Sequence, residues 1–83
     1  MTGAPLLAQL EQLHNDAWGW ALHCCQGDAH AAEEALQAAY VRVAEGRAEF
    51  GERAALKTWW LGVVRLVALE QRWRAWWRRL RPV

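Results

Sequence analysis

Apolar residues recur at steps of three and four along most of the chain, which is the spacing of one face of an α-helix. The first stripe begins at Leu6, and Gly27 follows it as a typical C-terminal stop. This pattern predicts a helix over roughly residues 5–26. Its inward positions are Leu6, Leu10, Leu13, Ala17, Trp20 or Ala21, and Cys24.

Two further helices follow in the same way. Asp28 offers an N-cap for a helix over 29–45 that ends near Gly46, and Pro82 forbids continuation of a helix over 54–80. The charged loop between them contains Phe50, whose ring is expected to anchor the loop to the core. The inward positions are Ala32, Ala35 or Leu36, Ala39 or Tyr40, and Val43 in the second helix, and Trp60, Leu61, Val64, Val67 and Ala68 in the third.

The pattern contains no β alternation, no internal repeat and no low-complexity segment. We therefore expect an all-α fold, a compact three-helix domain with a long C-terminal helix, and a four-helix arrangement also fits the pattern. Residues 1–83 form a single domain in this interpretation. At 83 residues, burial of apolar surface only narrowly exceeds the entropy cost of folding.

Charge is distributed unevenly between the two parts of the chain. Residues 1–56 carry eight acidic and three basic residues, a net charge of −5, whereas residues 57–83 carry seven basic residues and Glu70, a net charge of +6. The near-neutral total thus conceals a dipolar molecule. Such a molecule is expected to have two kinds of partner, or one partner that it meets with one end.

No residue pattern supports catalysis, a metal site or a cofactor. His23, Cys24 and Cys25 are contiguous, so their side chains fan around a helix instead of converging on a metal ion. Adjacent cysteines seldom form a disulfide, which indicates a reducing, cytoplasmic compartment. The N-terminus lacks the pattern of a secretory signal, and no run of about 18 apolar residues predicts a membrane span. We expect a non-enzymatic protein without a cofactor.

The C-terminal stretch 72–81 interleaves arginine with tryptophan. Guanidinium groups bind phosphates and indole rings stack on bases, so the stretch favours a nucleic acid. Tryptophans on a helix also serve as core or dimer contacts, and that interpretation stays open. On the second predicted helix, Glu34, Gln37, Val41 and Glu45 follow one stripe opposite the core, with Glu33 at its edge. This surface suits a basic helical partner, or is simply solvated.

The order of these features resembles region 2 of bacterial sigma factors of the extracytoplasmic-function group. Ala32 to Val43, AEEALQAAYVRV, is similar to the family's A-E-D-L-V-Q-E-x-F-L-R helix. Phe50 follows at the family's interval, Trp60 to Arg65 is similar to W-L-x-x-I-A-R, and Glu70 to Arg74 stands in place of D-x-x-R-R. The resemblance covers roughly residues 6–79.

The resemblance implies two partners. The second helix would bind the clamp helices of the largest RNA polymerase subunit, and the third helix with its preceding loop would hold the single-stranded −10 region of promoter DNA. The polymerase-binding residues would be Glu33, Glu34, Gln37 and Val41. The DNA-binding residues would be Phe50, Trp59, Arg65, Arg72, Trp73, Arg74, Trp76, Arg78 and Arg79.

The sequence also departs from the family pattern. Ala38 stands where the family has glutamate, Leu66 stands where it has asparagine, and the domain that reads the −35 element is missing. A partner chain that supplies that domain, or an anti-sigma factor, is therefore a further candidate partner. Two rival interpretations remain: a degenerate module that binds another protein through its tryptophan-rich tail, and a helix that lies on a membrane surface.

Overall fold

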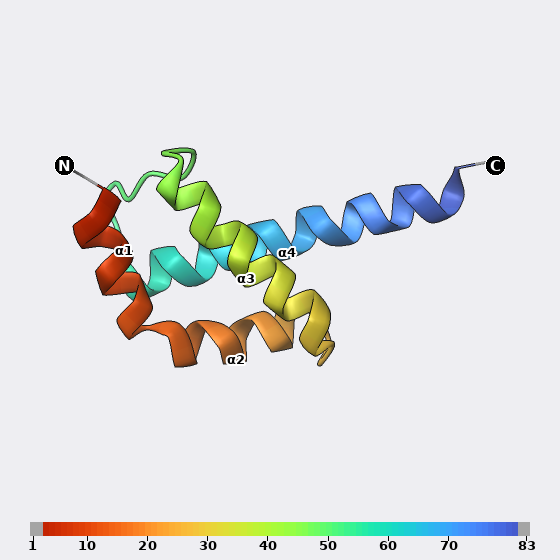
Figure 1. The fold of residues 1–83 in the computed structure, drawn as a ribbon, viewed down its shortest axis with the longest axis horizontal. Helices are drawn as coiled ribbons and strands as arrows, with labels where there is room; N and C mark the ends of the chain where they lie inside the picture. Colours follow the sequence, from red (N-terminus) through yellow and green to blue (C-terminus); the bar gives the residue numbers. More distant parts are fainter. Residues whose placement is uncertain (1–2, 82–83) are drawn as a thin grey trace.

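The computed structural model describes residues 3–81, which contain four helices and no strand (Figure 1). The expected all-α fold is thereby confirmed for this part of the chain. The helices predicted over 29–45 and 54–80 begin and end within two residues of the observed ones. The four helices are α1 (Gly3–Gln12), α2 (His14–Cys24), α3 (Ala29–Ala44) and α4 (Leu56–Leu80).

The single helix predicted over 5–26 is wrong, because the chain turns at Leu13. Leu13 has φ −97° and ψ 11°, and its N–H donates to the carbonyl of Leu10 at 2.9 Å, which closes a tight four-residue turn where α1 meets α2. The apolar stripe continues through this turn, since Leu10 before it and Ala17 after it are both buried. The bend lets α1 and α2 contact α3 while they run in different directions (Figure 1).

The predicted helix ends are confirmed at Asp28, Gly27 and Gly46. The Asp28 carboxylate accepts a hydrogen bond from the N–H of Ala31 at 3.0 Å, which caps α3. Gly27 (φ +84°) and Gly46 (φ +76°) adopt the left-handed conformation that ends α2 and α3. These two turns determine where α3 begins and ends.

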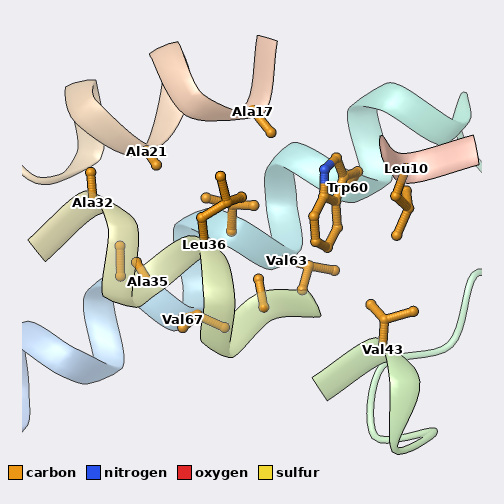
Figure 2. Close-up of a cluster of buried hydrophobic side chains, with 13 residues drawn as sticks. Leu10, Ala17, Ala21, Ala32, Ala35, Leu36, Val43, Trp60, Val63 and Val67 are labelled. Atoms are coloured by element: carbon orange, nitrogen blue, oxygen red, sulfur yellow. The ribbon is translucent and has the colours of Figure 1, made fainter. Parts of the chain in front are cut away.

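The core lies where α2, α3 and α4 meet, and Trp60 is the largest of its fully buried side chains (Figure 2). Alanines of α2 and α3 form much of the rest, which lets the helices approach closely. Trp20 joins α2 to α4 because its indole N–H donates to the carbonyl of Leu61 at 2.9 Å. The core residues are Leu10, Ala17, Ala21, Ala32, Ala35, Leu36, Ala39, Val43, Trp60, Val63, Val64, Val67 and Ala68.

The C-terminal half of α4 extends beyond the other three helices (Figure 1). The longest dimension of the molecule is 46 Å, whereas the other two are 23 and 20 Å. Trp73, Trp76, Trp77 and Leu80 lie on this extension and are 42–58% exposed. Most of the predicted nucleic-acid residues therefore lie on a helix that stands largely clear of the body.

Candidate functional site

The predicted acidic face of α3 is exposed. Glu34, Gln37 and Val41, here called the α3 stripe, lie three and four residues apart on the side of α3 that faces away from the core. Glu33 is also exposed, about 100° around the helix from Glu34. The Glu34 carboxylate lies 3.5 Å from the imidazole of His30, one turn earlier. The stripe is therefore accessible to a partner, and among the described residues its one carboxylate, that of Glu34, pairs with a residue of its own helix and not with another helix.

An ion pair that the sequence did not predict joins α3 to α4. The guanidinium of Arg42 donates two hydrogen bonds to the carboxylate of Glu70, at 2.5 and 3.2 Å. These bonds hold the pKa of Glu70 below its ordinary value and raise the pKa of Arg42. Arg74 lies 3.9 Å from the same carboxylate. The sequence contains one indication of this pair: Glu70 is the one acidic residue of the basic segment 57–83.

A groove of about 770 Å³ lies between α3 and α4. The α3 stripe contributes Glu34, Gln37 and Val41 to its lining, and α4 contributes Arg72, Arg74 and Arg78. The two surfaces predicted to bind different partners are thus two walls of one groove. Gln71 crosses it by donating to the backbone carbonyl of Glu34 at 3.4 Å.

The arginines of α4 do not share one face. Successive residues advance about 100° around a helix, so Arg65, Arg72 and Arg79 form one row at intervals of seven residues. Arg74 and Arg78 lie about 120° to 160° away from Arg72, on the side that faces α3. A strand that ran along a single line of α4 would meet one of these sets. Arg72 is the one arginine that lines both the groove and a smaller hollow on the other side of α4, where Arg79 also lies.

Phe50 and Trp59 form a separate aromatic pair at the start of α4. Their ring centroids are 5.3 Å apart with an interplanar angle of 45°, and Trp59 packs against the core. Phe50 therefore attaches the loop through Trp59, which refines the expectation that its ring would anchor the loop to the core. Trp59 and Arg72 are 13 residues apart, a distance of about 20 Å along the helix.

The three tryptophans of the α4 extension contact one another. Trp76 meets Trp73 edge to face at 5.4 Å and Trp77 at 5.3 Å. All three rings are exposed, so they form a continuous aromatic surface beside the arginine row. Trp76 and Trp77 are adjacent, so their side chains leave the helix about 100° apart, yet their rings still meet.

Other chemistry is sparse among residues 3–81. No three His, Cys, Asp or Glu side chains gather there in a way that could hold a metal ion. None of the helices in this range combines the length and apolar character needed to cross a membrane. Cys24 and Cys25 are half-buried thiols, and burial raises the pKa of both. A raised pKa lowers the thiolate fraction at neutral pH, which makes both thiols poor nucleophiles.

Comparison with known families identifies the domain. Residues 10–79 match the sigma-70 region 2 family, so the chain belongs to that family. The match covers all of α2 and α3 and nearly all of α4. No curated protein and no solved structure shows a match to the chain. Membership of this family of transcription factor domains supports a sigma-factor-like role in transcription initiation.

Proposed function

We propose that this domain acts in bacterial transcription initiation without catalysing a reaction itself, by binding RNA polymerase through α3 and promoter DNA through α4. The observation that carries the proposal is the family match over residues 10–79, together with an exposed α3 stripe and a basic α4. The site of action is the cytoplasm, where the polymerase works. Chemistry is left to the polymerase.

The polymerase surface consists of Glu33 and the α3 stripe. Acidic and amide side chains on an exposed helix suit a basic helical partner, and Val41, 48% exposed, supplies an apolar contact at the end of the stripe. The partner we propose is the pair of clamp helices of the largest polymerase subunit. Ala38, half-buried beside the stripe, provides no carboxylate, so the contact relies on Glu33 and Glu34 for its charge.

The DNA surface consists of the basic and aromatic residues of α4 and its preceding loop. A single strand of the −10 region would place phosphates against the row Arg65, Arg72 and Arg79. Arg74 and Arg78, on the side of α4 that faces α3, would meet the strand only where it crosses from one side of the helix to the other. Its bases would stack on Trp73 and Trp76, and further along on Phe50 and Trp59. Leu66 is 51% exposed and offers neither a donor nor an acceptor, so sequence preference should be weak.

Reading of the −35 element belongs to the same proposal. A partner chain, or a part of the same protein outside residues 1–83, would supply it, and an anti-sigma factor would regulate the domain. Both possibilities leave the α3 and α4 surfaces in the roles given above.

The polymerase contact is tested with the isolated clamp coiled coil. Glu34→Arg with Gln37→Ala should abolish binding, because it reverses the charge of the stripe and removes its amide. The control is Glu11→Arg with Gln9→Ala, which makes the same changes at two exposed positions of α1. Both double variants should keep the wild-type melting temperature, since exposed substitutions seldom cost more than about 0.5 kcal/mol. Equal binding by the two variants would remove the assignment.

The DNA contact is tested by the salt dependence of binding to a non-template −10 strand. Replacing Arg72, Arg74, Arg78 and Arg79 with glutamine should flatten the slope of log K against log salt by about 0.7 for each phosphate that the variant no longer neutralises. Lys57→Gln is the control, because Lys57 is engaged by Asp16 at 3.1 Å and lies far from the extension. A wild-type slope near zero, or no binding at moderate salt, would refute the DNA role.

A further inference from the structure

The outward face of α4 carries a second apolar stripe that nothing in the described residues covers. Its members recur at alternating steps of three and four residues and span an arc of about 80° on the side opposite Trp60. Leu69 is half-buried, and the others are 42–58% exposed. This outer seam consists of Leu66, Leu69, Trp73, Trp76 and Leu80, with Trp77 beside it.

The spacing of the outer seam is that of a helix that pairs with another helix. Apolar positions at steps of three and four over 15 residues present one continuous line to a partner about four turns long. A strand of nucleic acid gains by stacking on aromatic rings, and Leu66, Leu69 and Leu80 offer none. The aliphatic positions therefore offer contacts that a helical partner can use and that a nucleic-acid strand on the same face leaves unused.

The charges beside the outer seam indicate which helix would fit. Arg65, Arg72 and Arg79 border one edge at intervals of seven residues, and within residues 3–81 no carboxylate lies within 4.0 Å of any of them. On the other edge, Glu70 is engaged by Arg42 and Arg74. A partner would thus meet a row of unneutralised guanidinium groups.

A hollow of about 490 Å³ interrupts the outer seam. Leu69, Trp73 and Trp76 contribute apolar surface to it, and Arg72 and Arg79 contribute guanidinium groups. Gln26, from the turn between α2 and α3, also lines it. A hollow of this composition can receive an apolar side chain whose neighbours on the same helix are carboxylates.

We propose that the outer seam is the docking surface for an acidic amphipathic helix of another protein. The partner helix has apolar residues at steps of three and four and carboxylates along the edge that meets the arginine row. A second copy of this chain fits less well, because its seam brings another row of arginines and the one carboxylate of its segment 57–83, Glu70, is already engaged. The helix and a DNA strand would use the same arginines, so they would exclude each other.

This proposal does not depend on the DNA or polymerase roles and is tested without either. The probe is a fluorescently labelled, capped peptide of about 18 residues with leucine at seam spacing and glutamate on the flanking positions. Saturable binding to the full chain is expected, with a shift of tryptophan emission to shorter wavelength as the indoles become buried. A peptide with lysine in place of glutamate should bind at least about tenfold more weakly.

Aliphatic variants separate the docking of a helix from the stacking of nucleic-acid bases. Leu66→Ser with Leu80→Ser should weaken peptide binding at least about tenfold. Leu80→Ser alone should also weaken peptide binding and should leave binding of an oligothymidine strand unchanged, because Leu80 does not stack on a base and lies outside the proposed DNA surface. Val41→Ser, which changes an exposed aliphatic residue on α3, is the matched control and should change binding less than about twofold. Equal binding of the glutamate and lysine peptides, or insensitivity to the leucine changes, would overturn the proposal. So would a dimer in sedimentation that the same leucine changes dissociate, since a second copy would then cover the seam.

Discussion

The Arg42–Glu70 pair makes the most specific thermodynamic prediction for this fold. Among the described residues it is the one ion pair in which an arginine bonds both oxygens of a carboxylate, and it joins α3 to α4 beside the groove between the two proposed binding surfaces. Arg42 is 17% exposed and Glu70 is 36% exposed. The pair is therefore neither fully buried nor fully screened by solvent.

The expected coupling free energy of the Arg42–Glu70 pair follows from that intermediate exposure. Hydrogen bonds to charged groups contribute about 1.5 to 3 kcal/mol when they are well shielded, whereas exposed ion pairs contribute about 0 to 1 kcal/mol. We expect a coupling free energy of about 1 to 2 kcal/mol from the double-mutant cycle of Arg42→Gln and Glu70→Gln. The exposed Lys57–Asp16 pair is the control, and its coupling should stay below about 0.5 kcal/mol.

The pH dependence has a definite sign. Because the Arg42 guanidinium lowers the pKa of Glu70 below its ordinary value of 4.5, the native state favours the ionised carboxylate more than the unfolded chain does. The stabilisation is complete well above pH 4.5 and is lost as the pH falls through the lower, folded-state pKa. Urea unfolding at about pH 7 and about pH 3 measures it. A coupling below about 0.5 kcal/mol near neutral pH, or a coupling that rises on acidification, would refute this reasoning.

Three further predictions concern the core, the end of α3 and the specificity of α4. Trp60→Ala should lower the free energy of unfolding by about 3 to 5 kcal/mol because it empties the centre of the core, whereas Trp77→Ala, on the exposed extension, should change it by less than about 0.5 kcal/mol; urea titration measures both. Gly46→Ala should cost about 1 kcal/mol because φ is +76°, while Gly62→Ala, at an open position within α4, should raise the thermal midpoint slightly. Leu66→Asn should keep the fold and sharpen discrimination among −10-like strands, and strong selectivity in the unchanged protein would show that specificity lies elsewhere.

The sequence predicted the core and the helix ends well because both depend on local chemistry. The three-and-four spacing placed Leu10, Ala17 and Val64 correctly inside. Asp28 begins α3 and Gly46 ends it for reasons that involve only near neighbours. The turn at Leu13 escaped prediction because it contains neither glycine nor proline and the apolar stripe runs through it. At that turn α1 and α2 both contact α3, and no local sequence pattern predicts such contacts.

The candidate site was predictable in composition but not in arrangement. Helical spacing predicts the exposure of Glu34, Gln37 and Val41. It also predicts that Trp76 and Trp77 leave the helix in different directions. The groove that brings this stripe next to the α4 arginines depends on how α3 crosses α4, which no spacing rule specifies. The same is true of the Arg42–Glu70 pair, whose members are 28 residues apart.

A photo-crosslinking amino acid at position 37 tests the central claim most directly. With purified core RNA polymerase, crosslinking at Gln37 followed by mass spectrometry should identify the clamp helices of the largest subunit. The same amino acid at Gln9, exposed on α1, should give no such product. Absence of a crosslink from position 37, or a crosslink to another part of the polymerase, would contradict the account.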